Sequence, residues 1–232
     1  MIDRKALLSD LQSVLKDIEA DLIARSDSDE LPEVKSWLQT EYDTAKEAER
    51  TALNFTDWLN DHVTQVAAGW VLSCVFVRFL EDNQLIDPPR ISGAGERLDR
   101  ARDEQTLFFQ DPERAKLTDR EYLLSIFTML AESPYQVDIF TRHNPIHFLP
   151  NWLSGDAATV LLNFFRRIDS DAEASNTLIH DFTDPDWDTR FLGDLYQDLS
   201  ERARKKYALL QTPDFVEAVS YTHLTLPTIL LV

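Results

Sequence analysis

The segment Val63–Ile86, VTQVAAGWVLSCVFVRFLEDNQLI, constrains the fold most, because apolar residues occur on nearly every side of the helix that it would form. A helix that is apolar all round is either buried at the centre of a domain or crosses a membrane. Arg78 interrupts the segment and Glu81 and Asp82 follow directly, whereas a membrane span needs about 20 predominantly apolar residues. The sequence therefore predicts a buried central helix over about residues 63–86.

Two residues within this segment bear on its packing. Gly69 costs roughly 1 kcal/mol relative to alanine in a helix interior, so it indicates the close approach of another helix near Trp70, with a tolerated glycine as the alternative. Cys74 is the single cysteine of the chain, which excludes an internal disulfide bond. Because its setting is apolar and no histidine lies nearby in sequence, Cys74 is predicted to be a small buried hydrophobe and not a nucleophile.

Composition favours helices over strands. The 232 residues include five glycines, and glycine-poor chains lack the turn residues that many β-hairpins need. We therefore predict a mainly α fold, an irregular bundle of several helices around the central helix, with no complete Rossmann-like domain. Met1–Lys5 have no apolar signal core behind them, so we expect a cytoplasmic protein with no membrane contact.

The chain is strongly acidic, with a formal net charge of −18. Binding to a nucleic-acid backbone is driven by lysine and arginine and by the release of counterions. This composition argues against the chain gripping DNA by itself. Any DNA contact of a longer protein would have to be made by its other parts.

Amphipathic segments precede the central helix. Asp3 would cap a first helix, and Arg25–Leu31 would connect it to a second helix from Pro32 to about Thr51 that pairs antiparallel with it. The first helix would pack through apolar residues spaced alternately three and four apart, namely Leu8, Leu11, Leu15, Ile18 and Leu22.

Further helices follow the central one. Asp119 would cap one helix, and Asp156 would open another that ends at Arg166 and Arg167, where positive charge suits the helix dipole. The aromatic segment Phe140–Trp152 between them is expected to pack on the core, although it could instead stack on a base or dock a partner.

Two short patterns resemble functional motifs, one for a metal site and one for a nucleotide-binding loop, but neither is complete. Pro145 lies between His143 and His147 and breaks the helix that would place both on one face, so no metal site is predicted. Residues 93–95, Gly-Ala-Gly, follow no strand and lack the third glycine of a nucleotide-binding loop, which favours an ordinary turn.

The stretch Phe182–Val216 contains two helix starts. Asp184 before Pro185, and Thr212 before Pro213, each combine a capping side chain with a proline at the first helical position. The first of these helices would pack through one apolar face, made of Leu192, Leu195, Leu199, Ala203 and Tyr207.

The run DFTDPDWDTRFLGDLYQDLSERARKKYALLQTPDFV resembles the segment ahead of the catalytic domain in the PglX family, adenine-specific DNA methyltransferases of bacteriophage-exclusion (BREX) systems. The resemblance extends more loosely upstream through VTQVAAGWVLSCVFVRFLEDNQLI and RHNPIHFLP. It implies a parent enzyme that transfers a methyl group from S-adenosylmethionine to adenine N6 of duplex DNA by base flipping and so marks host DNA as self. Other phage-defence proteins are further possible partners.

The same resemblance suggests a cofactor contact. Leu210-Gln211-Thr212-Pro213 is similar to the aromatic-Tyr-Thr-Pro element that begins the catalytic domain of such enzymes and helps to hold S-adenosylmethionine. Gln211, Thr212 and Pro213 are therefore candidate cofactor-binding residues, although Gln211 replaces the usual tyrosine. A capped helix start offers free N–H groups to the cofactor's carboxylate, and a plain helix cap is the alternative.

Two expected catalytic motifs are absent. The family's glycine-rich cofactor loop and its Asn-Pro-Pro-aromatic tetrad do not occur; Asp87-Pro88-Pro89 is followed by Arg90, so we interpret it as a turn. No catalytic residue is assigned, and we expect this chain to be inactive. The alternative function is a non-catalytic helical module that docks another defence protein or imitates DNA with its acidic faces.

The composition changes abruptly at Val219, because VSYTHLTLPTILLV contains no charged residue of the kind that makes up 28% of the chain. Residues 219–228 resemble the translation of a transposon-end adapter used for sequencing libraries, and a genuine C-terminal strand is the alternative. We therefore expect a helical N-terminal domain over 1–181, a connector and the start of the missing methyltransferase domain over 182–218, and a non-native tail over 219–232.

The absence of both catalytic motifs gives a negative prediction. Titration of this chain with S-adenosylmethionine should release no measurable heat of binding in calorimetry, because the pocket for the methyl donor is missing. Micromolar affinity would contradict the expectation.

Overall fold

The structure, a computed structural model, describes residues 3–132, 140, 144–184, 195 and 199. Within them the fold is mainly α, as predicted, and the extended structure described is a single antiparallel bridge between Ile168 and Leu178. The helices are α1 (Arg4–Ser26), α2 (Pro32–Glu47), α3 (Phe55–Asp82), α4 (Glu96–Gln110), α5 (Asp119–Ala131) and α6 (Gly155–Phe164), with two short 3₁₀ turns, η2 (Pro145–His147) and η3 (Pro150–Trp152).

The buried central helix is confirmed as α3, but its bounds differ from the predicted 63–86. It begins at Phe55, where the Asn54 side chain accepts the N–H of Asp57 at 2.9 Å. Its first two turns carry polar residues, so they do not belong to the apolar run. It ends at Asp82 because the Asn83 amide caps the carbonyl of Phe79 at 2.8 Å and Gln84 then adopts a φ of 57°.

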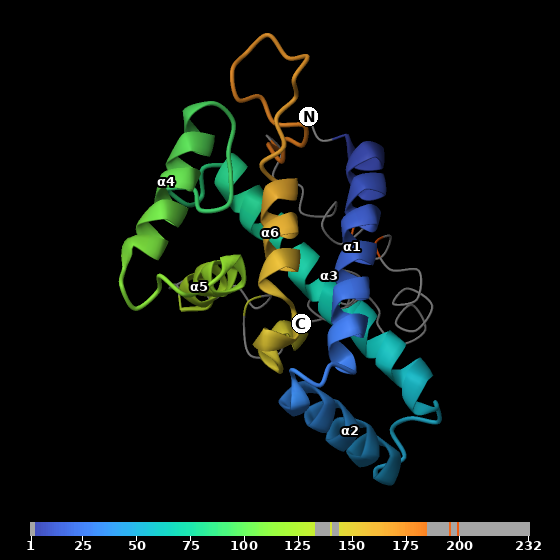
Figure 1. Cartoon of the computed structure of the whole chain (residues 1–232). Helices are drawn as coiled ribbons and strands as arrows, with labels where there is room; N and C mark the ends of the chain where they lie inside the picture. The colour runs from blue at the N-terminus through green and yellow to red at the C-terminus, as the bar shows by residue number, and fades with distance from the viewer. Residues whose placement is uncertain (1–2, 133–139, 141–143, 185–194, 196–198, 200–232) are drawn as a thin grey trace, which may run out of the picture.

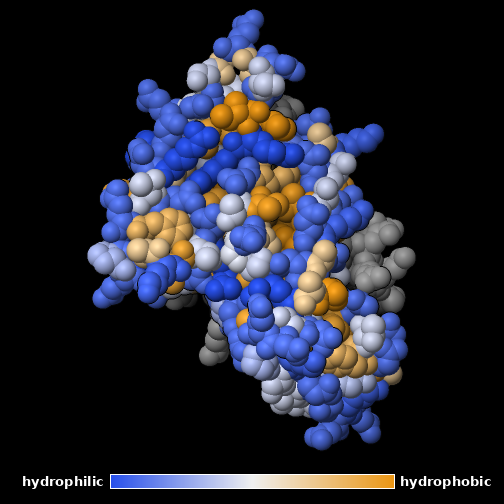
Figure 2. All heavy atoms as spheres, in the orientation of Figure 1, coloured by the Kyte–Doolittle hydropathy of each residue, from blue (hydrophilic) through white to orange (hydrophobic). Residues whose placement is uncertain are grey.

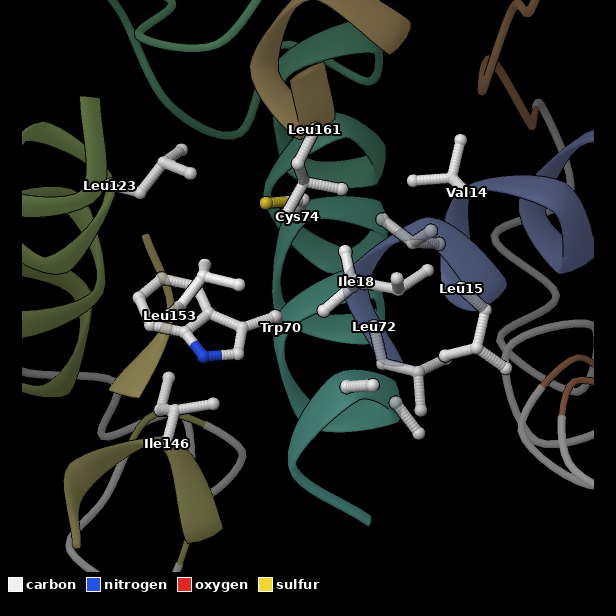
Figure 3. Packing of buried hydrophobic residues seen from close by; sticks show 14 of the residues in the cluster. Val14, Leu15, Ile18, Trp70, Leu72, Cys74, Leu123, Ile146, Leu153 and Leu161 are labelled. Carbon is white, nitrogen blue, oxygen red and sulfur yellow. The ribbon is translucent and has the colours of Figure 1, made fainter. Parts of the chain in front are cut away.

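Two opposite faces of α3 bury different neighbours (Figure 3). Leu72 lies on the side of α1, toward Leu15. Trp70 points the other way, toward Leu153 and Ile146, and its ring centroid lies 5.9 Å from that of Phe127 in α5. This two-sided burial is what an all-round apolar helix requires.

The length and composition of α3 would allow it to cross a membrane, but 72% of its most apolar window is buried inside the protein. A core helix meets the same criteria. This burial agrees with the sequence prediction, in which Arg78 argued for a buried helix and against a membrane span. Arg78 itself is 0% exposed.

The close approach predicted at Gly69 is confirmed, although the neighbour is the turn η2 and not a helix. A Cβ atom at Gly69 would lie 3.0 Å from Oδ1 of Asn144 and 3.2 Å from Ile146. Asn144 is itself fixed by bonds to Ser73 and to the backbone of Ile146. Glycine therefore lets the aromatic segment lie directly on α3, which confirms its expected packing on the core.

The first helix is confirmed with its Asp3 cap, which accepts the N–H groups of Lys5 and Ala6. It continues to Ser26, so the connector begins at Asp27 and not at Arg25. Its buried residues face α3 and α6, which both contact α1. Figure 1 shows that α2 continues beyond the end of α1 instead of running back alongside it. The expected antiparallel pairing of these two helices was therefore wrong.

The cap predicted for α5 was one residue too late, and Asp156 lies in the first turn of α6, as predicted. Thr118 caps α5, in a capping box with Glu121, while Asp119 is the first helical residue. Ser154 caps α6 by accepting the N–H of Ala157 at 3.0 Å. The acidic residues that follow each cap lie in the first turn, where the helix dipole also favours them.

The sequence prediction explained Arg166 only by the favourable interaction of its charge with the helix dipole, but Arg166 also binds distant segments. It is 9% exposed and donates from Nε to the carbonyl of Ile91 at 2.7 Å, and also to Gln105. Arg167 does lie at the surface, where it pairs with Asp10 at 2.9 Å. Arg166 thus joins the end of α6 to the loop before α4 and to α4 itself.

A buried ion cluster closes the C-terminal end of α3. Arg78 lies 2.6 Å from Asp82 and 3.3 Å from Glu81. Both oxygens of the Glu81 carboxylate also accept backbone N–H groups from residues 90–92, at 2.5 to 3.0 Å. Burial raises the pKa of Glu81, while Arg78 and these N–H groups oppose the shift.

The first prediction from the fold concerns Arg78. Arg78→Met leaves two buried carboxylates without their cation, so the free energy of unfolding in urea should fall by about 3–5 kcal/mol. Arg102→Met is the matched control, because it breaks an exposed pair with Asp99 and should cost less than about 0.5 kcal/mol. Equal losses in the two variants would contradict the assigned role.

The second concerns Cys74, whose thiol is fully buried and whose pKa is raised well above its usual value, first by burial and second by Glu81. Native protein should react with Ellman's reagent at least about 100-fold more slowly than unfolded protein. A Cys74→Ala, Ser9→Cys variant carries an exposed thiol in the same fold and should react rapidly. Fast reaction of the native thiol would rule out its burial.

Candidate functional site

The candidate cofactor-binding residues Gln211, Thr212 and Pro213 lie outside the described residues, so their role stays a prediction. Of the apolar face predicted for the segment after Pro185, Leu195 and Leu199 are described; both are helical and are 6% and 4% exposed within the main core. The chain therefore returns to the bundle at these two positions, as expected. The other members of that face lie outside the described residues.

The part of the chain that the structure describes contains no group of three or more side chains that could hold a metal ion. His147 lies in η2 with Nε2 3.1 Å from the carbonyl of Phe140. His143 is not among the described residues. The prediction for the pair therefore stays untested at His143.

The Asp87-Pro88-Pro89 turn serves a structural purpose. Asp87 pairs with Arg97 and Arg100 of α4, each at 3.1 Å. Arg97 also donates to the carbonyls of Glu81 and Ile86. The acidic side chain thereby ties the loop to α4.

The Gly-Ala-Gly turn at 93–95 leads into α4 with Gly95 at a φ of 62°. Glu96 and Asp99 occupy the first turn of the helix. Their negative charge opposes the binding of a phosphate at this N-terminus. The turn fits its interpretation as ordinary structure.

A pocket of about 250 Å³ lies between α4 and α5. Its cations are neutralised locally, since Arg90 pairs with Glu104, and Arg114 lies 3.4 Å from Asp111 and 4.9 Å from the Phe108 ring. It is lined by Arg90, Glu104, Leu107, Phe108, Arg114, Tyr122, Ser125, Ile126 and Met129. Figure 2 shows a hydrophobic area near the place where these two helices meet, on a face that is mostly hydrophilic.

The two hydroxyl groups in the lining of this pocket donate hydrogen bonds to backbone carbonyls. Tyr122 donates its hydroxyl to the carbonyl of Arg90 at 2.8 Å, and burial raises its pKa, so the phenol stays neutral. Ser125 donates its hydroxyl to the carbonyl of Tyr122 at 2.7 Å. The lining therefore offers apolar and aromatic area without an activated nucleophile.

Sequence reasoning did not identify this pocket because it did not predict α4. The helix reads ERLDRARDEQTLFFQ, and Leu98 and Ala101 are its buried residues. Two buried positions on a highly charged segment give little periodicity. The aromatic pair Phe108 and Phe109 was the remaining signal.

Comparisons with known proteins bear on identity. No protein-family model matches the chain, and no solved structure matches it. The chain is 46% identical over 229 residues to the adenine-specific methyltransferase PglX of Streptomyces coelicolor, a match that covers 94% of this chain and 18% of that protein. The chain thus spans about a fifth of the length of this relative. It is a PglX-type sequence, and it corresponds to the N-terminal part of such a protein.

Proposed function

We propose that this chain is the N-terminal region of an S-adenosylmethionine-dependent DNA methyltransferase that modifies adenine at N6. The observation that carries the proposal is the 46% identity to PglX across 94% of the chain. The relative's name gives adenine-specific methyl transfer. The methyl donor, the N6 position and the DNA substrate are inferred from that class of chemistry.

The chain alone is inferred to be inactive. Methylation within a duplex requires a pocket that receives a flipped base and places its amino group beside the methyl donor. The charged side chains that line the α4–α5 pocket are paired locally, Arg90 with Glu104 and Arg114 with Asp111. The base and cofactor pockets therefore belong to other parts of the longer enzyme.

Within that enzyme the bundle would act as a scaffold ahead of the catalytic domain. Gln211, Thr212 and Pro213 would begin that domain, and the helix start at Thr212 would direct N–H groups toward the cofactor's carboxylate. The net charge of −18 supports the proposal that duplex DNA is held by other parts. The enzyme would work in the cytoplasm in phage defence, marking host DNA as self, alongside other defence proteins.

Residues 219–232 are proposed to be non-native. The match to PglX leaves about 6% of the chain uncovered, a share equal in size to this tail. The domain boundaries at 181 and 218 stay predictions.

A second candidate function is a non-catalytic interaction module. The acidic composition and the pocket between α4 and α5, which is lined by apolar, aromatic and paired charged side chains, favour it, because both suit contact with a protein partner. The two functions are compatible, since a scaffold domain of a methyltransferase can also dock a partner.

The proposal is tested by reading the gene past codon 218 from an independent clone. We expect a frame without LTLPTILLV that encodes a glycine-rich loop and an Asn-Pro-Pro-aromatic tetrad. The extended protein should then transfer labelled methyl groups from S-adenosylmethionine to adenine in duplex DNA, while the present chain should stay at background.

The matched control is the extended protein with alanine in place of the tetrad's asparagine, which should lose methyl transfer but keep the fold. Absence of both motifs from the extended frame would overturn the methyltransferase proposal. Recovery of a defence protein by the bundle alone, in that case, would favour the interaction module.

A further inference from the structure

The segment that follows α6 returns to the C-terminal end of α3. Figure 1 shows this segment, in orange, beyond the end of α6. Phe182 is fully buried there, with its ring 6.1 Å from that of Phe165 and 5.5 Å from the Arg78 guanidinium. The contact joins residues about 100 positions apart in the chain.

Backbone groups of this segment bind side chains of α3 and its cap. The N–H of Phe182 donates to Asp82 at 2.9 Å. The Asn83 amide donates to the carbonyl of Phe182 at 2.9 Å, and its oxygen accepts the N–H of Asp184 at 2.9 Å. One short side chain thus satisfies a donor and an acceptor on the same strip of backbone, which fixes both position and direction.

The chain returns to the core shortly after this strip. Leu195 and Leu199 are buried in the same cluster that contains Phe182. Fixing Phe182–Asp184 on the bundle lowers the entropic cost of bringing Leu195 and Leu199 back to it, because a chain closes a short loop more easily than a long one.

We propose that Asn83, together with Asp82, is a positioning residue: it clamps Phe182–Asp184 and so sets the path by which the chain leaves the bundle and seats Leu195 and Leu199. This inference concerns the chain's own residues and does not depend on methyl transfer. In a longer PglX-type protein the same clamp would set the direction in which the polypeptide continues.

Asn83→Ala is the direct test, because it removes both bonds from Asn83 to the exit segment, Phe182–Asp184, and leaves the ion pairs of Arg78 with Glu81 and Asp82 in place. It also removes the cap on the Phe79 carbonyl, so faster exchange is expected at the last turn of α3 as well. Amide hydrogen exchange of the whole chain should be about tenfold faster at Asp184 and faster also at Leu195 and Leu199. Amides within α1 and α5 should exchange as in the unaltered protein.

Asn151→Ala is the matched control, since it removes a single cross-element bond, to Glu33 at 2.8 Å, away from the clamp. It should leave exchange at Asp184, Leu195 and Leu199 unchanged. Faster exchange in Asn83→Ala at Asp184 alone would overturn the proposal, because the bond would then be local only. Equal acceleration throughout α1 and α5 would also overturn it, because Asn83 would then support the whole fold.

Discussion

The burial of Arg78 is the constraint on which the rest of the structure depends. A guanidinium removed from water loses several kcal/mol of solvation and needs charged partners in good geometry. Glu81 and Asp82 supply them from the next turn of the same helix. Because these carboxylates are then buried too, their remaining lone pairs must be satisfied, and backbone from distant segments does so.

The loop at residues 90–92 supplies the hydrogen bonds that the buried Glu81 carboxylate requires, and it is itself held by other helices. Ile91 and Ser92 are fully buried, so every polar backbone group of the loop needs a partner. The three N–H groups bind Glu81 from one side. From the other side Arg166 donates to the carbonyl of Ile91, and Tyr122 to that of Arg90. Residues from α3, α5 and the end of α6 therefore converge on a short loop, and this convergence orders these three helices around it.

The difference between what sequence could and could not predict follows from the range of the interactions. An all-round apolar run predicted α3, and a three-four alternation predicted α1, because both patterns are local. The cap of α5 was misplaced by one position, since Asp119 suits a first helical turn as well as a cap. The roles of Arg166 and Glu81 could not be predicted, because their partners lie 75 and about 10 residues away in a loop without periodicity.

The same limits apply to function. The PglX resemblance depends on the run from Asp181 to Val216, and the comparison with a known protein supports it. The geometry of the described residues does not by itself suggest methyl transfer, because the charges that line the α4–α5 pocket are paired and Cys74 is fully buried.

Asp82 connects the centre of the bundle to the segment through which the chain leaves it. Asp82 serves the Arg78 cluster and the exit segment at once, through the Phe182 N–H. Since the cluster also holds the loop before α4, the path of the chain out of the bundle is coupled to the packing of its centre. A change that repositions Arg78 would therefore affect Phe182 as well as Ile91, while a change at Asn83 would affect Phe182–Asp184 and the cap at the end of α3.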